Sequence, residues 1–331
     1  MIEIDGSFGE GGGQIVRTAV ALSAVTGKPV RIKNIRQARP KPGLAPQHAQ
    51  AISALARICN ARTSGADPGS SEIAFEPSEI RGGRYKVEIG TAGSVTLLMQ
   101  CLLPALLKSD SPIVLEVHGG TDVQWSPTVD YFRNVFLPAL EGFGARIRLE
   151  LWQRGYYPRG QGTVLLQVEP AELKTAHLKA QAAPVVGISH SSNLPEHVAK
   201  RQAEAASLAL QQAGFQSEIA TESLAVASTG SGITLWSGHK GGSALGKRGL
   251  PAETVGKKAA LEIISELRSA TAVDVHLADQ LIPYLALAGG SYTTREISMH
   301  TRTNIWTAEH FLKRKISVFG EDIIRVEALS V

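Results

Sequence analysis

The feature of this 331-residue sequence that most limits its fold is a repeated unit of proline, short β-branched strand, polar loop and long amphipathic helix. Copies begin at Pro29, Pro112 and Pro184, and a degenerate copy begins at Arg295. A second and more apolar helix type, opened by Gly or Ser, precedes several of these units. The alternation predicts an α/β (α+β) fold of β-α-β-α-β-β modules, in which helices cover sheets.

The copy that begins at Pro184 stands apart from the others. It lies in a segment richer in Ser, Ala and Lys, which holds its own strands and two helices. A chain of this length also exceeds the usual size of a single hydrophobic core. We therefore expect a large domain over residues 1–179 and 273–331, with residues 180–272 forming a smaller inserted α/β domain.

Composition is that of an ordinary globular protein, with 43% apolar and 19% charged residues. No apolar run approaches the ~20 residues that span a bilayer, and Glu3 and Asp5 stand where a signal peptide would be basic and then apolar. We expect a cytoplasmic protein with no membrane partner. Cys59 and Cys101 lie in apolar helical stretches, which is typical of reduced core thiols. The net charge of +4 is weak support for an anionic substrate.

The stretch GEGGGQIVR, from Gly9 to Arg17, is a glycine-rich loop that leads into an apolar helix. Such a loop is typical of phosphate binding, although it matches neither the Walker nor the dinucleotide fingerprint, and a plain tight turn is the alternative. Glu10 favours the functional interpretation, because a carboxylate beside phosphates can hold a hard divalent cation. A second segment, Gly241 to Lys247, has Walker spacing, but Arg248 replaces the metal-binding hydroxyl. We interpret that segment as a substrate-side or hinge loop.

The segment IRQARPKPGLAPQH brings three cations into a loop that prolines stiffen, namely Arg36, Arg39 and Lys41. Gln47 and His48 are predicted in the first turn of the following helix. Cations ahead of a helix N-terminus form an anion site, because free N–H groups add to the side chains. A solvated basic loop is the alternative.

His300 is the histidine that we select from nine for a chemical role. We expect it at a strand end, in a loop before a helix that Thr303 caps, where a neutral imidazole is a candidate nucleophile or general base. A structural role is the alternative at this point. His310 is expected to pack at the flank of that helix.

Two further polar features suggest partners in a pocket. Asp279 and Gln280 are interpreted as opening an apolar helix, where Asp279 would carry an N-terminal helix charge. Gln100 is polar on an otherwise apolar helix and needs a partner.

Seven motifs, in the same order along nearly the whole chain, resemble the RNA 3′-terminal phosphate cyclase family: DGSFGEGGGQIVRTAVALS, RPKPGLAPQH, GTAGSVTLLMQ, GGTD, GYYPRGQG, LADQL and HTRTN. The resemblance implies a large domain of three β-α-β-α-β-β modules, similar to the enolpyruvate transferases, with a smaller inserted domain. It also implies an ATP-dependent enzyme whose partner is an RNA with a 3′-phosphate end. Such an enzyme forms a 2′,3′-cyclic phosphodiester through a covalent histidine–AMP and an RNA(3′)pp(5′)A end.

The resemblance carries over residue by residue. His300 matches the family nucleophile, and Glu10 matches the glutamate linked to a divalent metal, Mg²⁺ or Mn²⁺. Residues around the phosphates and the RNA end are matched by Arg17, Arg36, Arg39, Gln47 and His48. The nucleotide pocket is matched by Gln100, His276, Leu277, Ala278, Asp279 and Gln280, with His276 standing where some relatives have a tyrosine.

Two other functions remain alternatives to an active cyclase. One is the non-catalytic branch of the family, which serves in ribosome assembly and lacks the nucleophilic histidine. The other is an enolpyruvate-type transferase of the same architecture, which would bind a small phosphorylated acid. The oligomeric state also stays open, with a homodimer as one alternative.

Overall fold

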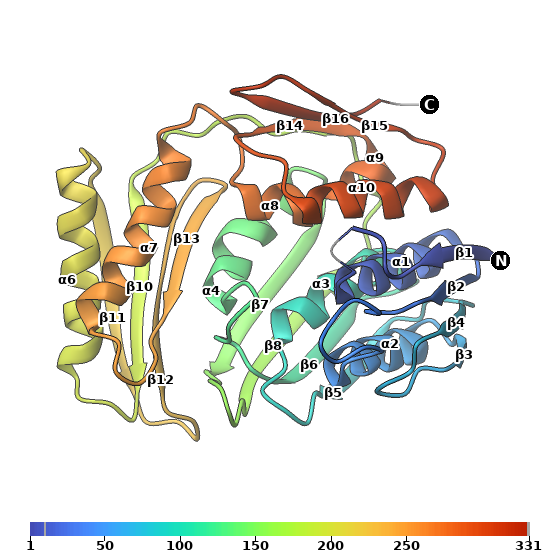
Figure 1. The fold of residues 1–331 in the computed structure, drawn as a ribbon, viewed down its shortest axis with the longest axis horizontal. Helices are drawn as coiled ribbons and strands as arrows, with labels where there is room; N and C mark the ends of the chain where they lie inside the picture. Colours follow the sequence, from blue (N-terminus) through green and yellow to red (C-terminus); the bar gives the residue numbers. More distant parts are fainter. Residues whose placement is uncertain (10, 330–331) are drawn as a thin grey trace.

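The computed structural model describes residues 1–9 and 11–329. Its strands form four sheets of four strands each, drawn in Figure 1. Three of these sheets share one strand order, and the fourth has a different order. The first three belong to the repeated modules, and the fourth belongs to a segment inserted into the third module.

The first module contains β1 (Ile2–Asp5), α1 (Gly13–Thr26), β2 (Val30–Lys33), α2 (Pro46–Ile58), β3 (Arg62–Ser64) and β4 (Ile73–Glu76). Its strands lie in the order β1-β2-β4-β3, with β1 parallel to β2. Most residues of helix α1 are buried, including the apolar run from Ala19 to Leu22. It ends at Gly27, whose φ of 68° is the left-handed conformation that glycine adopts without strain.

The second module contains β5 (Gly83–Glu88), α3 (Val95–Leu106), β6 (Ile113–Gly119), the continuous helical segments α4 (Val129–Tyr131), η1 (Phe132–Phe136) and α5 (Leu137–Glu141), then β7 (Arg146–Gln153) and β8 (Gly162–Glu169). The strand order is again first, second, fourth, third, with the first two strands parallel. Side chains of β6 alternate between buried and half-buried, as expected for a strand with one face on the core.

The third module is interrupted after its first strand. It contains β9 (Ala176–His177), then α8 (Val275–Gln280), α9 (Ile282–Ala288), β14 (Gly290–Thr294), α10 (Met299–Phe311), β15 (Ile316–Phe319) and β16 (Ile324–Ala328). Read from β9, the order is β9-β14-β16-β15, which matches the other two modules.

The inserted segment contains β10 (Val185–Ser192), α6 (His197–Gln212), β11 (Ser217–Leu224), β12 (Gly230–Ser237), β13 (Lys240–Leu245) and α7 (Ala252–Leu267). Its strand order is β11-β10-β12-β13, and its helices pack against each other and against this sheet (Figure 1). A separate hydrophobic cluster joins the sheet to the two helices.

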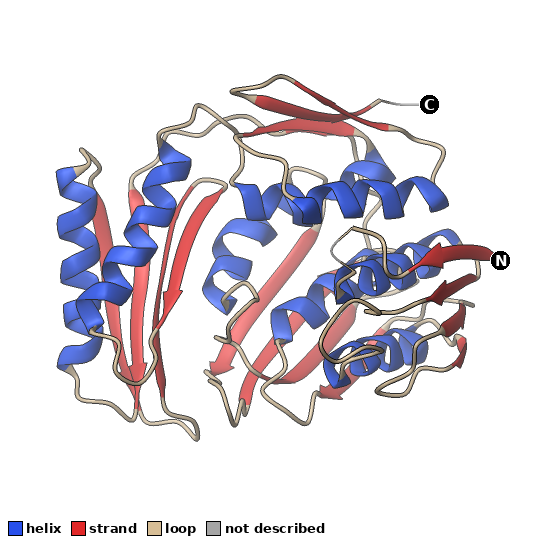
Figure 2. Ribbon diagram, in the orientation of Figure 1, coloured by secondary structure: helices blue, strands red, loops and turns tan. Residues whose placement is uncertain are grey.

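The helices of the three modules pack together on the inside of the molecule. Helix α1 contacts both α3 and α10, and the module sheets lie toward the outside (Figure 2). This arrangement brings the N-terminal ends of helices from different modules into one region. It therefore positions the candidate site described below.

The mixed α/β fold with three β-α-β-α-β-β modules is confirmed. Copies from Pro29 and Pro112 each cover the second strand and second helix of a module, whereas the degenerate copy from Arg295 covers only the second helix, α10, because β14 ends at Thr294. The copy from Pro184 is not a fourth module, because β10 lies between β11 and β12 in its sheet. The boundaries at residues 180 and 272 remain a prediction.

Two smaller expectations concern the core and the membrane. Cys59 and Cys101 are free and buried, as predicted, and burial raises their thiol pKa values to about 11 and about 12. Among the described residues, none of the helices combines the length and apolar character that crossing a membrane requires.

Candidate active site

His300 lies in the first turn of α10, which begins at Met299. The helix is capped by Ser298, whose Oγ accepts a hydrogen bond from the backbone N–H of Thr301 at 3.1 Å. We expected His300 in a loop and Thr303 as the cap of the following helix. Both expectations are wrong, since His300 lies in the first turn and Thr303 lies inside the helix with its side chain buried. The sequence SMHTRTN offers three hydroxyls that can cap a helix, and tertiary packing selects the first of them.

The hydrogen bonds of Gln14 define which nitrogen of His300 carries its proton. The Nε2 amide of Gln14, in α1, donates to Asp279 Oδ1 at 2.5 Å and to the His300 carbonyl at 3.1 Å. The Oε1 of the same amide contacts His300 Nδ1, so Nδ1–H donates to it. In the neutral ring, the other nitrogen, Nε2, then has the lone pair that a nucleophile needs.

Hydrogen bonds among Asp279, Asn304 and Thr18 fix the position of the Gln14 amide. Asn304 Nδ2 donates to Asp279 Oδ1 at 2.6 Å, and Thr18 Oγ1 donates to Asn304 Oδ1 at 2.7 Å. Burial raises the pKa of Asp279, while the nearby His300 and Gln14 act in the opposite direction. Asp279 and Gln280 end α8 instead of opening an apolar helix, which corrects their predicted position.

A cavity of about 420 Å³ lies beside His300. Six of the predicted site residues line it, namely Arg17, Gln100, His276, Asp279, Gln280 and His300. Leu277 and Ala278 are not among its lining residues, because their side chains are fully buried in the hydrophobic core.

Several polar atoms in the wall of this cavity have no partner among the described residues. They are Gln100 Nε2, Gln280 Oε1 and the hydroxyl of Tyr284. Buried polar groups are normally hydrogen-bonded, so a ligand with donors and acceptors at its edge suits this wall. Gln100 was predicted to require a hydrogen-bond partner, and its Nε2 has none among the described residues.

His276 contributes positive charge at the opening of the cavity. Its Nε2 lies 3.2 Å from Glu262 Oε1, and the other Glu262 oxygen accepts from the Ser243 N–H at 2.9 Å. The hydrogen bond to Glu262 raises the pKa of His276 to about 9, so the ring is charged at neutral pH. His276 thus combines an aromatic face with a cation.

The predicted phosphate-binding residues gather at the N-terminal end of α1. A Cβ on Gly13 would lie 2.0 Å from the His48 ring, and one on Gly12 would lie 3.5 Å from Arg39 Nη2. Only glycine at position 13 allows His48 to pack this closely. Gly12, the N-cap residue of α1, has no side chain with which to cap the helix, so among the described residues its first amides are candidates for binding an anion.

The cations in this region act on one another. Burial lowers the pKa of Arg17 and of Arg36, and burial together with these two cations lowers the pKa of His48 to about 3. Arg36 Nη1 donates to the Gly43 carbonyl at 2.9 Å, which fixes its loop. His48 is therefore neutral and packs between cations.

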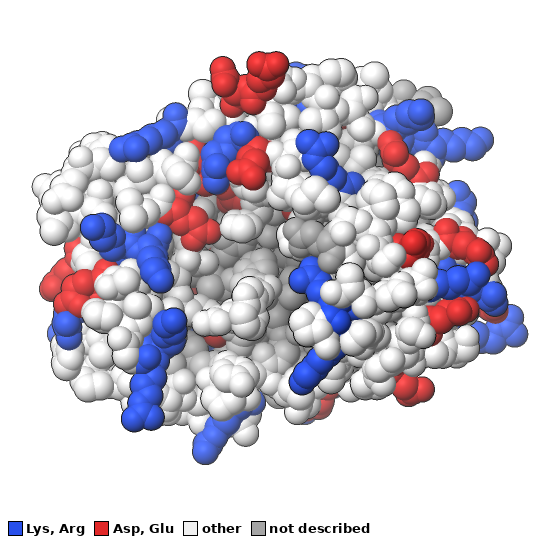
Figure 3. Space-filling model, viewed as in Figure 1, with Lys and Arg blue, Asp and Glu red and all other residues white. Residues whose placement is uncertain are grey.

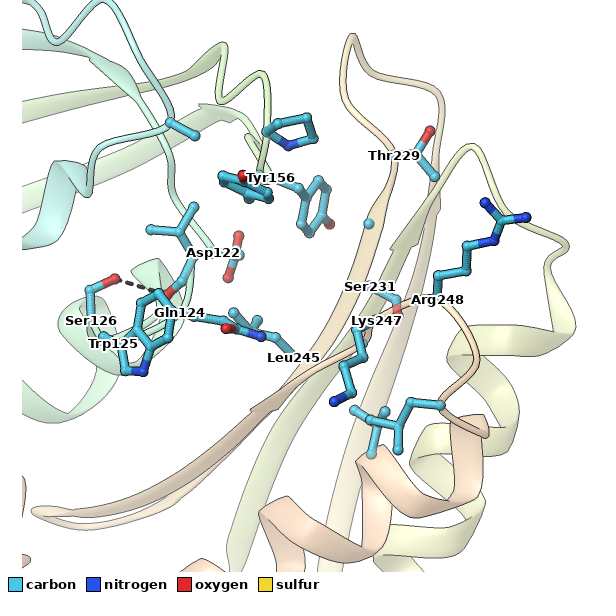
Figure 4. Close-up of a pocket in the computed structure, with 18 of the residues that line it drawn as sticks. Asp122, Gln124, Trp125, Ser126, Tyr156, Thr229, Ser231, Leu245, Lys247 and Arg248 are labelled. Atoms are coloured by element: carbon cyan, nitrogen blue, oxygen red, sulfur yellow. Dashed lines mark hydrogen bonds between the residues drawn. The ribbon is translucent and has the colours of Figure 1, made fainter.

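Gln47 lies in the first turn of α2, as predicted, but on the wall of a larger cleft of about 1320 Å³. This cleft runs between the second module and the inserted segment, as Figure 4 shows. Leu97, Trp125 and Ser126 line both the cleft and the cavity beside His300. The two hollows are therefore adjacent.

Glu10, the predicted metal ligand, lies outside the described residues. Within the part of the chain that the structure describes, one group has the composition of a metal site: Asp122, Asp130 and His190. Arg154 Nη1 already pairs with Asp130 at 2.7 Å and with Asp122 at 3.3 Å. This group is consequently a neutralised ion cluster, and the divalent metal remains a prediction.

Gln14 and Asn304 were not predicted as site residues, although Gln14 lies in the glycine-rich stretch GEGGGQIVR and Asn304 in the motif HTRTN. Gln14 is a polar residue directly before an apolar helical run, and Asn304 ends the HTRTN motif. Polar residues on the buried faces of their helices are the signal that would have identified them.

Comparison with known proteins gives one consistent result. A family model described as RNA 3′-terminal phosphate cyclase matches residues 8–318. Proteins of that name from Methanosarcina barkeri and Archaeoglobus fulgidus are 58% and 55% identical to this chain, which covers 96% and 99% of their lengths. The protein of that name from Pyrococcus furiosus is 48% identical over 97% of this chain and 96% of its own.

Among solved structures, an EPSP synthase from Acinetobacter baumannii matches at 10% identity with a TM-score of 0.31. The match covers 95% of this chain and 62% of that one, so this chain spans less than two thirds of that protein.

Proposed function

Because this chain belongs to the RNA 3′-terminal phosphate cyclase family, we propose that it uses ATP to convert the 3′-phosphate at an RNA end into a 2′,3′-cyclic phosphodiester. The observation that carries the proposal is the hydrogen bond from His300 Nδ1–H to Gln14, which in the neutral ring places the lone pair on Nε2. His300 lines a cavity whose wall also carries polar groups without a hydrogen-bond partner among the described residues, together with the cations Arg17 and His276.

In the first step, His300 Nε2 attacks the α-phosphorus of ATP. A P–N bond forms, the P–O bond to pyrophosphate breaks, and pyrophosphate leaves. The imidazole is a suitable nucleophile because the P–N bond that it forms is labile. Gln14 and Asp279 stabilise the positive charge that the ring acquires, since Nδ1–H already points at this amide.

In the second step, an oxygen of the RNA 3′-phosphate attacks the same α-phosphorus and the P–N bond breaks, which restores His300. In the third step, the adjacent 2′-OH attacks the RNA phosphorus, loses its proton and expels AMP. The overall change converts ATP and an RNA 3′-phosphate into AMP, pyrophosphate and the cyclic end.

Positive charge must balance the phosphates in each step, because electrostatic positioning carries most of such transfers. Arg17, Arg36 and Arg39 lie with His48 around the open N-terminus of α1 and are the proposed contacts of the phosphates. Gln100 and Gln280 are the proposed contacts of the adenine edge, with His276 over its face. A divalent cation would supply further charge neutralisation, and Glu10 is its proposed ligand.

The test is formation of a protein–AMP adduct. The purified protein is incubated with ATP labelled at the α-phosphate and Mg²⁺ or Mn²⁺, and the product is treated with acid and with alkali. We expect an adduct that is labile in acid and stable in alkali, as a P–N bond requires. His300→Ala abolishes it, while His310→Ala retains it because that exposed ring contacts Trp306 of its own helix and does not line the cavity.

A second assay follows the RNA product. An RNA labelled at its 3′-phosphate becomes resistant to phosphatase once the phosphate is cyclic. Absence of the adduct in the wild-type protein, with no cyclic end formed, would favour the non-catalytic branch of the family. An enolpyruvate-type transferase would likewise form no adduct, and would bind a small phosphorylated acid.

A further inference from the structure

The large cleft has two walls of different character. One wall comes from the second module and carries Trp125, Tyr156 and Tyr157. The other comes from the inserted segment and carries Lys247 and Arg248, in the loop that follows β13 (Figure 4). None of these side chains has a part in the transfer steps described above.

The cleft begins where the active-site cavity ends. Trp125 and Ser126 border both hollows, and Gln47 of the phosphate-binding group lies on the cleft wall. A polymer whose end reaches His300 therefore has a continuous path into the cleft.

Charge along this path favours a polyanion. The side chains of Lys247 and Arg248 are exposed and make no salt bridge or hydrogen bond to the described residues, whereas Arg201 on the same wall is paired with Glu253 at 2.6 Å. Asp122 is a carboxylate in the lining, and the buried Arg154 pairs with it. Figure 3 shows Lys and Arg side chains on both sides of a central hollow on this face of the molecule.

Two aromatic side chains are exposed to an unusual degree. Trp125 is 94% exposed and Tyr157 is 76% exposed, although aromatic rings normally bury most of their surface. Trp125 also has a φ of 61°, a left-handed conformation that is strained for a bulky residue. Exposed rings beside cations are the combination by which proteins bind single-stranded nucleic acid, because bases stack on the rings and phosphates contact the cations.

We propose that this cleft binds the nucleotides that precede the 3′ end of a single-stranded RNA. Bases stack on Trp125 and Tyr157, and backbone phosphates contact Lys247 and Arg248. The inference rests on the proposed function for the identity of the polymer. It adds a second binding region, which recognises the length and single-stranded character of the RNA independently of its terminal phosphate.

The test compares RNA lengths by direct binding without ATP. Fluorescence anisotropy follows a labelled 3′-phosphorylated RNA of eight nucleotides, and a nucleoside 3′-phosphate and a dinucleotide compete for it. We expect the octamer to bind about tenfold or more tightly than either short ligand. Lys247→Gln with Arg248→Gln should remove most of this gain and lower the slope of log affinity against log salt by about 1.4, since two phosphate contacts are lost.

Tyr157→Ala tests stacking separately from charge. It should weaken octamer binding about tenfold and leave the salt dependence unchanged. The double substitution of Lys257→Gln and Lys258→Gln is the matched control, because it removes the same amount of charge. Both lysines are exposed on α7 and lie outside the cleft lining. This control should bind the octamer as the wild-type protein does, and a thermal melt of each variant confirms that it is folded.

The outcomes separate this inference from the proposed function. Adduct formation by the wild-type protein needs only ATP and tests the function alone. Equal affinity for the octamer and the dinucleotide, or octamer binding unaffected by the cleft variants, would show that the RNA does not follow the cleft. A further competition uses polyglutamate, an acidic polymer without bases. If polyglutamate and unlabelled RNA displace the octamer equally well, and Tyr157→Ala changes the affinity for neither polymer, the cleft is a general surface for acidic polymers and the inference is wrong.

Discussion

At the scale of single residues, the chemistry of the site depends on which His300 nitrogen carries a proton. Gln14 decides this, because its amide is oriented by donating to Asp279 and so presents an oxygen to Nδ1. Gln14 is thus a positioning residue and His300 is the residue that reacts. The sequence separation of 286 residues explains why no local pattern predicts the pair.

Gln14→Ala should slow formation of the protein–AMP adduct about tenfold or more at saturating ATP, because one oriented hydrogen bond to a charged ring is lost. The ATP concentration that gives half the maximal rate should change little, which distinguishes orientation from binding. Single-turnover measurements at several ATP concentrations separate the two quantities. An unchanged maximal rate would remove Gln14 from this role.

His48 gives a prediction about pH. Its pKa is about 3 in the folded protein, against 6.5 for an ordinary histidine. Between these values the unfolded chain binds a proton that the folded protein does not, so stability falls as the pH falls below about 6.5. From pH 7 to pH 4.5 the wild-type protein should lose about 2 to 3 kcal/mol more free energy of unfolding than His48→Asn.

Urea unfolding of both proteins at the two pH values measures this difference. Only the difference between the pH effects matters, because the substitution also changes packing against Gly13 at both pH values. Parallel loss of stability in the two proteins would contradict a neutral buried His48.

At the scale of elements, the repeated sequence units identify the second strand and second helix of the first two modules, as in β2 with α2, but only the second helix, α10, of the third. Periodicity is sufficient there because each strand and helix buries one face on the same core. It is insufficient for the unit from Pro184, since a strand-helix pair does not determine which neighbours the strand pairs with. The start of α10 could not be predicted either, because several adjacent hydroxyls can cap a helix.

Ser298 offers a test of how that helix start serves the site. Ser298→Ala should lower the free energy of unfolding by about 1 kcal/mol, because the N–H of Thr301 loses its acceptor. It should also slow adduct formation, since His300 lies in the turn that frays. Ser298→Asn restores a capping oxygen and should recover both properties; if stability falls and the adduct rate does not, the cap serves only the fold.

At the scale of the whole molecule, a buried guanidinium is one of the contacts that join the inserted segment to the second module. Arg154, 2% exposed, pairs with Asp122 and Asp130 of the second module and with Glu222 of β11 at 3.0 Å. The guanidinium and Glu222 come from opposite sides of the RNA cleft proposed above. The pairing with Glu222 could not be predicted from sequence, because it forms only when the inserted sheet docks on the second module.

Arg154→Met should lower the free energy of unfolding by about 3 to 5 kcal/mol, because the buried Asp122 and Asp130 lose the guanidinium that they share and Asp130 keeps only Arg133. Arg133→Met is the matched control: it also pairs with Asp130, at 2.9 Å, but its side chain is 34% exposed. That loss should be about 1 kcal/mol or less. Combining Arg154→Met with Asp122→Asn and Asp130→Asn should recover stability relative to Arg154→Met alone, because the buried negative charges are removed. Urea unfolding measures the stability of each variant. Equal losses for the two arginine variants would contradict the cluster's part in joining the inserted segment to the second module.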